Sequence, residues 1–556
     1  MKVLKILGYV VIGVLVLLAC LYCAFVMFFF TDKPRERVTD GSYQLGEEIR
    51  LYEGEAPGSE GLKNVELYYG GENQTAMNVT VPTLIPYLPN DNVATDAAVI
   101  VCPGGANFFL SMDDEGHHPA QWFAQHGLKA FVLKYRPTHL GNNRWEAARE
   151  FLRFLKIFLT GKPSKGNEKD EKMFEIMSNL TNPDSDCEDM AVADGKQAIR
   201  YLRAHAEEYG IDPNKICIMG FSNGGILSNR VAYTCSPEER PDMIGPIYGP
   251  MDYDYLPENP MPLFAAAPEL DLFGAPTTYS IYKNWQKAGV PAELHYFAGE
   301  GVAHGFAYRK GKATTDIWIK MFYNFMIKTG FVPEKDVPTL KQEATPEMAE
   351  NAPFTLINDE LTAYIPDTTA TTGVGVVICP SGQGTENPEA ERSHVAEWLA
   401  KHGIAAFVMK DAASMDMSQA MSWVRSRTQA WGIDNEKVGV MGFAEGAEQA
   451  SMALYQDSKP AFAALLYGAS EQEKLPEKAA PIFIVAPELD KAPGTTGYDL
   501  FLKWHDAQVP AELHYFPFTE HGFGYQQSGE PVNVWLELFY NFLIKNGFVN
   551  TQGFAS

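Results

Sequence analysis

The sequence predicts an α/β protein: a mainly parallel sheet with helices on both faces, built twice in tandem behind an N-terminal membrane-spanning helix. Three observations predict this architecture. Short apolar runs that end in Pro or Gly alternate with amphipathic helical segments, which is typical of parallel sheets. Several stretches of the chain occur twice. Finally, residues 6–30 carry no charged side chain.

The apolar run from Ile6 to Phe30 exceeds the roughly 20 residues with which a helix crosses a bilayer. A cleaved signal peptide has a shorter apolar stretch, so we expect an uncleaved, single-pass signal anchor. The alternative is a lipoprotein, because LLAC at 17–20 resembles a lipoprotein cleavage box. The run continues ten residues beyond Cys20, however, which a lipid-modified N-terminus does not require. Basic residues flank both ends, so the orientation stays open.

The composition is that of an ordinary globular protein. The chain has 556 residues, 46% hydrophobic and 21% charged, which suffices for more than one buried core. Its formal net charge of −25 argues against nucleic acid as a partner, because phosphate backbones are bound by clustered Lys and Arg. No His or Cys pattern has metal-ligand spacing, so the sequence predicts no metal site.

An internal repeat defines the domain organisation. VPAELHYF occurs at 290–297 and again at 509–516, and FYNFMIKTGFV at 322–332 returns as FYNFLIKNGFV at 539–549. A Pro- and Glu-rich segment joins the two copies. The predicted parts are a domain at 45–332, a linker at 333–352 and a second domain at 353–549.

Strand and helix patterns alternate along the first copy. The predicted strands are 97–105, 129–135, 215–221, 243–248, 262–267 and 292–297. The predicted helices are 190–210, 224–233, 277–288 and 315–329. Ligands of such sheets bind at the carboxyl ends of the strands. Each loop that follows a strand is therefore a candidate site loop.

Residues 220–224, GFSNG, fit the pattern G-x-S-x-G between a predicted strand and a predicted helix. The serine of such a turn is strained, and only glycines two residues to either side let the neighbouring backbone pass. The turn holds the hydroxyl above the sheet at a helix N-terminus, where anionic intermediates are favoured. Ser222 is the candidate nucleophile.

Two other loops complete the candidate site. PGGA follows the strand at 97–105, so N–H groups of Gly104, Gly105 or Ala106 can stabilise an oxyanion together with that of Asn223; the alternative is a plain strand-ending turn. His304 follows the last strand, where the general base of the order serine, acid, histidine falls. Otherwise it is a solvated loop histidine.

The first copy resembles the acetyl esterase and acetylxylan esterase-like serine carboxylesterases of the α/β-hydrolase fold. The matching stretches are YEGEAPG, AAVIVCPGGA, AFVLKYRP, GKQAIRYLRAHAEEYGIDPNKICIMGFSNGG and KAGVPAELHYF followed by HGF. The resemblance spans about residues 50–332 and, less closely, the second copy. It implies a Ser–His–acid triad, no metal and no organic cofactor. It also implies small acyl esters as substrates, commonly acetyl groups on plant polysaccharides or small alcohols.

The acid of the triad is less plain, since the family acid is normally Asp. Counting back sixteen residues from Trp285 reaches Glu269, and the same count from Trp504 reaches Glu488. We therefore predict Glu269 as the acid, because a carboxylate of either length can orient the histidine. Asp271, two residues later, is the rival.

The first copy also contains an insert, about residues 137–189. From Pro103 to Ser222 is 119 residues, whereas the corresponding stretch of the second copy has 64, so the first copy is 55 longer. The insert leaves the carboxyl end of a strand, so we expect a cap beside Ser222. A surface helical hairpin is the alternative. Deleting about 142–185 should then change substrate preference more than stability.

The second copy keeps the frame without the nucleophile. GFAEG at 442–446 places Ala444 where the first copy has Ser222, and Glu488 and His521 are the counterparts of the acid and the base. A methyl group cannot attack a carbonyl. We therefore expect a degenerate hydrolase domain with a structural role, with substrate or glycan binding as the alternative.

Together these features predict a serine esterase that hydrolyses short, acetyl-type esters, some of them on carbohydrates. The anchor favours domains outside the cytoplasm, in the periplasm or at the cell surface. The first rival is a serine peptidase of the prolyl-oligopeptidase type, although no propeller repeat occurs. The second is a non-catalytic carbohydrate-binding or scaffold protein, which the complete constellation of the first copy disfavours.

Overall fold

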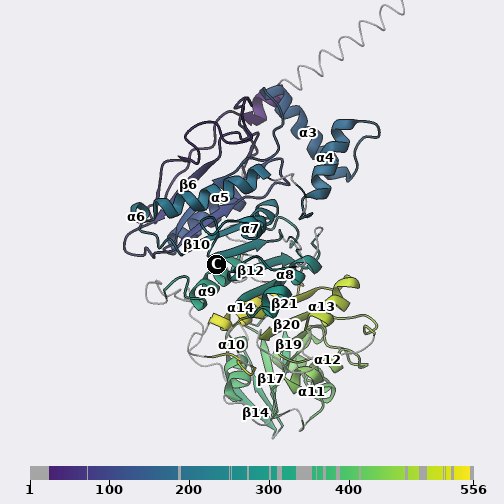
Figure 1. Ribbon diagram of the computed structural model, residues 1–556. Coiled ribbons are helices and arrows are strands. Elements are labelled where there is room, and N and C mark those ends of the chain that lie inside the picture. The colour runs from purple at the N-terminus through teal and green to yellow at the C-terminus, as the bar shows by residue number, and fades with distance from the viewer. Residues whose placement is uncertain are drawn as a thin grey trace, which may run out of the picture. The chain divides into compact units, whose positions relative to one another are not determined.

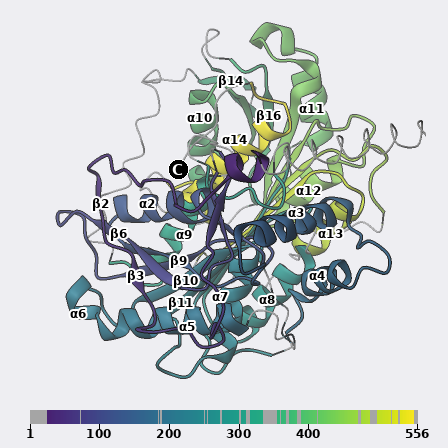
Figure 2. The same ribbon diagram turned by 90° about the horizontal axis from the view of Figure 1, so that it is seen from above.

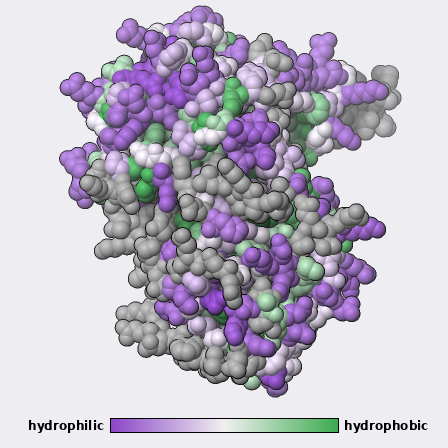
Figure 3. All heavy atoms as spheres, turned by 60° about the horizontal axis from the view of Figure 1, so that its bottom comes forward, coloured by the Kyte–Doolittle hydropathy of each residue, from purple (hydrophilic) through white to green (hydrophobic). Residues whose placement is uncertain are grey.

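The computed structural model divides into two compact units, Met1–Asn259 and Pro260–Ser556 (Figure 1). It describes residues 24–71, 73–183, 185, 189–249, 251, 253, 255–271, 275–299, 302–309, 316–333, 354–358, 360–366, 371–382, 388–411, 413, 415–469, 474–487, 497–517, 519, 521–526 and 531–550. On the face seen in Figure 3 these residues are mainly hydrophilic, with apolar side chains in small patches.

The predicted membrane anchor falls largely on residues 1–23, outside the described part of the chain. Of the anchor, only residues 24–30 are described: 24–29 are helical, and Val26 and Phe30 are buried in an apolar cluster. Within the described ranges, no helix is long and apolar enough to span a bilayer.

A parallel sheet forms the centre of the first unit. Its strands are β9 (Lys129–Lys134), β7 (Ala98–Cys102), β10 (Ile216–Phe221) and β11 (Met243–Ile247), in that order. Every residue of these strands is buried, which explains their continuous apolar sequences. The sheet is extended antiparallel to β9 by β6 (Thr83–Pro89), and β6 pairs with β2 (Tyr43–Leu45) and β3 (Ile49–Arg50).

Helices cover both faces of this sheet, as the alternating pattern predicts (Figure 2). They are α2 (His118–Gln125) on one face, and α5 (Asp189–Ala204) and α7 (Asn223–Thr234) on the other; the short α6 (Ala206–Tyr209) follows α5. A buried ion pair fastens α5 to the end of β9: Arg136 Nη2 lies 2.7 Å from Asp194 Oδ1.

The insert forms the helices α3 (Arg144–Thr160) and α4 (Glu168–Asn179). Asn143 caps α3 by accepting the N–H of Glu146, and Gly161 ends the helix in the left-handed conformation. A small antiparallel sheet lies beside it, of β1 (Phe30–Thr31), β4 (Leu67–Tyr69), β5 (Thr75–Met77) and β8 (Leu110–Ser111). One apolar cluster joins α3 to this sheet, and Phe154 stacks on Phe108 with ring centroids 4.6 Å apart.

This packing corrects the expected effect of deleting the insert. Removing about 142–185 takes Phe151 and Phe154 out of a core that also buries Leu67, Met77 and Phe108. Each buried Phe contributes about 3–5 kcal/mol, against a typical total stability of about 5–15 kcal/mol. We expect the deletion variant to be insoluble or to melt far below the wild type in thermal unfolding. Shortening only the turn at 162–166 is the control and should leave the melting temperature nearly unchanged.

The second unit contains a longer sheet. In spatial order its strands are β12 (Leu263–Pro268), β13 (Ala292–Phe297), β21 (Ala511–Phe516), β20 (Ile482–Pro487), β19 (Ala463–Leu466), β18 (Val438–Phe443), β16 (Gly375–Cys379), β17 (Ala405–Met409), β15 (Leu361–Tyr364) and β14 (Phe354–Asn358). Its helices are α8 (Ala275–Lys287), α9 (Ile317–Lys328), α10 (Ser393–Lys401), α11 (Met417–Arg425), α12 (Glu445–Ala453), α13 (Gly497–Asp506) and α14 (Val534–Lys545).

The two copies of VPAELHYF pair with each other in this sheet. Strands β13 and β21 run antiparallel, with His295 opposite His514. The two imidazoles are buried and their Nδ1 atoms lie 3.1 Å apart. His295 Nε2 lies 2.7 Å from Glu293, and His514 Nε2 lies 3.2 Å from Glu512. Burial lowers the pKa of both histidines.

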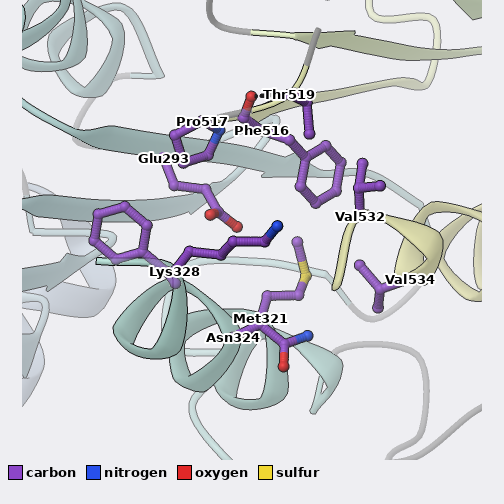
Figure 4. A pocket seen from close by; sticks show the side chains of 10 residues that line it. Glu293, Met321, Asn324, Lys328, Phe516, Pro517, Thr519, Val532 and Val534 are labelled. Carbon is purple, nitrogen blue, oxygen red and sulfur yellow. Dashed lines mark hydrogen bonds between the residues drawn. The ribbon is translucent and has the colours of Figure 1, made fainter. Parts of the chain in front are cut away.

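Residues of both copies also line a small pocket beside β13 and β21 (Figure 4). Glu293 and Lys328 from the first copy and Phe516 from the second line it, and its volume of about 20 Å³ suits one water molecule.

The boundary between the two compact units, at 259/260, falls inside the first predicted domain, because β12 and β13 belong to the same sheet as β20 and β21. The predicted linker lies almost entirely outside the described residues.

Candidate active site

Ser222 occupies a strained turn between β10 and α7. Its backbone angles are φ 49° and ψ −119°, a conformation that L-residues rarely adopt. A side chain on Gly220 would overlap the carbonyl of Gly224, and one on Gly224 would overlap that of Cys102 at the end of β7. The two glycines of G-x-S-x-G are therefore required by close backbone contacts. A serine on such a turn, at the carboxyl edge of a buried parallel sheet, defines an α/β-hydrolase.

The turn after β7 lies directly against Ser222. A Cβ built on Gly104 would come within 2.9 Å of Ser222 Cβ. Gly105 has φ 148°, and a side chain there would overlap the carbonyl of Phe109. Ala106 and Asn107 follow with φ 50° and 61°. These left-handed residues turn the backbone sharply at the place where the sequence predicts oxyanion donors.

Gly104 is not one of those donors, which corrects the prediction for this residue. Its N–H donates to Glu115 Oε2 at 3.0 Å, and the other carboxylate oxygen accepts the hydroxyl of Tyr248 at 2.7 Å. Glu115 is 6% exposed, so this buried brace fixes the turn. Sequence reasoning missed Glu115. The signal was available, because Glu115 and Glu391 each stand eleven residues before the histidine of a His-Gly pair.

Three predicted donors remain available for an oxyanion. In the described part of the chain nothing accepts the N–H of Gly105, Ala106 or Asn223. The side chain of Asn223 donates to the hydroxyl of Tyr135 at 3.2 Å, and that hydroxyl donates to the carbonyl of Pro103 at 2.7 Å. This chain of hydrogen bonds ties the start of α7 to the turn after β7. It leaves these N–H groups at the edge where Ser222 stands.

In the second unit, His304 is hydrogen-bonded to Asp271. Its Nδ1 lies 2.8 Å from Asp271 Oδ1, and the carboxylate is 1% exposed. His304 lies in a turn after β13, where Gly305 takes φ 81°. A carboxylate on Nδ1 orients the imidazole and leaves Nε2 for a substrate or a nucleophile.

In the structure the rival Asp271 is the carboxylate hydrogen-bonded to His304, so Asp271 takes the place of Glu269 as the candidate acid. Glu269 comes directly after β12 and turns toward the second copy, where its Oε1 accepts the N–H of Ala511 at 3.1 Å. Asp271 is two residues farther along the turn. The count of sixteen residues finds Glu269 in the first copy, where this residue packs against the second copy.

Glu269 makes stability depend on pH. Burial raises its pKa from 4.5 to about 8, and the nearby charge of Glu512 adds to the shift. A raised folded-state pKa stabilises the fold fully below about pH 4.5, and this contribution is lost as the pH rises through about 8. At about 1.4 kcal/mol per pKa unit, the free energy of unfolding should fall by a few kcal/mol over that range.

The variant Glu269→Gln should remove this slope, because a neutral amide replaces the titrating group. Urea unfolding at several pH values between 5 and 8.5 measures it, with the exposed Glu477→Gln as the matched control. A slope in Glu269→Gln as steep as in the wild type would contradict the assignment.

The second copy preserves the backbone of the nucleophile turn. Ala444 has φ 48° and ψ −117°, nearly the angles of Ser222. Glu391 accepts the N–H of Ser381 at 2.9 Å and the hydroxyl of Tyr467 at 2.5 Å, as Glu115 does in the first copy. His521 packs edge-on against the Tyr467 ring, with centroids 4.9 Å apart. Glu488 lies outside the described residues. Across the described ranges, no cluster of three or more His, Cys, Asp or Glu could hold a metal ion.

Comparisons with known proteins agree with this class. The family model BD-FAE matches residues 187–256, and the model of the dienelactone hydrolase family matches residues 408–534. The acetylxylan esterase of Xylanibacter ruminicola is 25% identical over 159 residues, which is 29% of this chain and 23% of that protein. The endo-1,4-beta-xylanase B of Butyrivibrio fibrisolvens is 26% identical over 152 residues, 27% of this chain and 17% of that protein.

The chain thus spans less than a quarter of the length of these curated relatives. Among solved structures, an acetyl ester-xyloside bifunctional hydrolase from Caldicellulosiruptor lactoaceticus is similar over 53% of this chain and 100% of its own, with 21% identity and a TM-score of 0.36. Esterase 2 of Thermogutta terrifontis is similar over 54% and 99%, with 18% identity and a TM-score of 0.36. The chain has an α/β-hydrolase fold, as its motifs predict, and one segment of each copy matches one of the two family models.

Proposed function

We propose that the protein is a serine esterase that hydrolyses short acyl esters, with Ser222, His304 and Asp271 as its triad. The observation that carries the proposal is the strained turn of Ser222 beside the N–H groups of Gly105 and Asn223, which no described residue accepts. The hydrogen bond between His304 and Asp271 supports it. Such a set of groups is the minimum that acyl transfer through a serine requires.

In this mechanism Ser222 Oγ attacks the ester carbonyl carbon while its proton passes to His304 Nε2. The N–H groups of Gly105 and Asn223 stabilise the negative oxygen of the tetrahedral intermediate. His304 then gives the proton to the departing alcohol, leaving an acyl group on Ser222. A water molecule attacks this acyl group by the same route, which releases the carboxylic acid and restores the serine.

Acetyl groups, including those on plant carbohydrates, are the proposed substrates, since a curated relative is named an acetylxylan esterase. The uncharged run at 6–30 supports attachment to a membrane, with the enzyme outside the cytoplasm. The second copy is proposed to be a pseudo-hydrolase that supports the first through the pairing of β13 with β21. In serine hydrolases of this kind, removing one oxyanion donor lowers kcat by roughly 10²–10³.

A panel of nitrophenyl esters of increasing acyl length, together with acetylated xylo-oligosaccharides, tests this proposal. We expect turnover of acetyl and propionyl esters, a steep fall with longer chains, and release of acetate from the sugar. A fluorophosphonate probe should label Ser222 in the intact protein. Absence of both labelling and turnover in folded protein would refute the esterase.

A further inference from the structure

The second copy retains the two backbone donors of an oxyanion site. Gly382 corresponds to Gly105 and Glu445 to Asn223, and the nucleophile turns at Ser222 and Ala444 have nearly the same backbone angles. The turns after the strands differ in one respect, because Gly105 has φ 148° and Gly382 does not take a positive φ. Ser381 in place of Gly104 does not change this, because its N–H donates to Glu391 just as that of Gly104 donates to Glu115. The loss of one glycine in this turn therefore leaves the donors in place.

These donors already have an occupant. Gly382 N–H donates to Glu445 Oε2 at 3.1 Å. The pKa of the Glu445 carboxyl is lowered by hydrogen bonds from the N–H of Gly382 and from the backbone N–H of Glu445 itself. The charge of His521 lowers this pKa further. In the first copy the same position is Asn223, whose side chain is turned away to Tyr135. The second copy thus has a carboxylate where the first copy has open donors.

We propose that the second copy contains a preformed anion-binding site that its own Glu445 fills, so that this copy is blocked twice, by Ala444 and by Glu445. A negative oxygen formed on a substrate at this place would meet a fixed carboxylate and find its donors taken. The ligand class that the site fits is the oxyanion of an acyl or phosphonyl group. Restoring the serine alone is therefore insufficient, and exchanging both residues restores a reactive site.

The experiment uses the full chain with Ser222→Ala, so that labelling reports only on position 444. Two further variants are made in this background: Ala444→Ser alone, and Ala444→Ser together with Glu445→Asn. Each protein is treated with a fluorophosphonate. In the labelling step the serine oxygen forms a bond to phosphorus, the P–F bond breaks, fluoride leaves and the hydroxyl proton passes to His521. Intact mass gives the rate and peptide mapping gives the site.

We expect the double exchange to be labelled at 444 at least tenfold faster than Ala444→Ser alone. Equal rates would overturn the role of Glu445. Folded double variant that stays unlabelled would also overturn the proposal, because two exchanges would then not suffice. Both variants should fold, since Glu445 is exposed and residue 444 already has the backbone angles of a nucleophilic serine.

If the double exchange nevertheless fails to fold, the reciprocal change decides. Asn223→Glu in the otherwise natural chain should slow labelling of Ser222 by roughly a hundredfold relative to Asn223→Gln, which has the same shape without the charge. Equal rates in these two variants would refute the blocking effect of a carboxylate. The inference rests on the proposed function only through the chemistry of Ser222. If Ser222 is not labelled in the natural chain, the proposed function is refuted. If Ser222 is labelled in the natural chain but the double exchange is not labelled at position 444, only this inference is refuted.

Discussion

Ser222→Ala is expected to lower kcat for nitrophenyl acetate by roughly 10⁴ to 10⁶, because members of a triad act as a unit. His304→Ala should lose nearly as much. The acyl-enzyme needs a hydroxyl at this strained position, beside the N–H groups of Gly105 and Asn223. Steady-state kinetics with purified protein measure the loss, and fluorophosphonate labelling should disappear in Ser222→Ala.

The double variant Ser222→Ala/His304→Ala makes this prediction sharper. Ser222 lies in the first compact unit and His304 in the second, so their joint action is tested by non-additivity. If they act on the same step, the double variant is no slower than the slower single variant. Losses that multiply would show two independent effects. Ser228→Ala, a buried serine of α7 whose hydroxyl donates to the carbonyl of Gly225, is the matched control and should retain most activity.

Asp271→Asn is expected to reduce kcat by roughly 10⁴, because an amide in place of the triad acid favours the wrong tautomer of the histidine. Glu269→Gln should change kcat less than tenfold, since Glu269 accepts the N–H of Ala511 whereas Asp271 is hydrogen-bonded to His304. The two substitutions are matched in chemistry and lie two residues apart. The pH profile of kcat/KM should keep its acidic limb in Glu269→Gln.

The opposite result, a severe loss in Glu269→Gln with little change in Asp271→Asn, would contradict the assignment of the acid. The stability of both variants needs to be measured alongside. Glu269→Gln is expected to be as stable as the wild type at low pH and more stable above about pH 8, as its raised pKa requires.

The sequence by itself determined the elements around the nucleophile. The buried strand Ile216–Phe221, the glycine-flanked Ser222 and the helix Asn223–Thr234 all follow from local pattern, because apolar runs, glycine spacing and helix starts depend on near neighbours. The repeat also showed where the second nucleophile is missing. Each of these features is encoded within a few turns of chain.

Only the tertiary structure decided the remainder, and in each case the reason is a contact between residues that are not neighbours in the sequence. Asp271 and His304 are 33 residues apart, and nothing local distinguishes Asp271 from Glu269. The carboxylate of Glu115 takes the N–H of Gly104, while that of Glu445 takes the N–H of Gly382, 63 residues away. The pairing of β13 with β21 joins residues more than 200 positions apart. Repeated sequences show that two segments fold alike, but they do not show that the segments pair with each other.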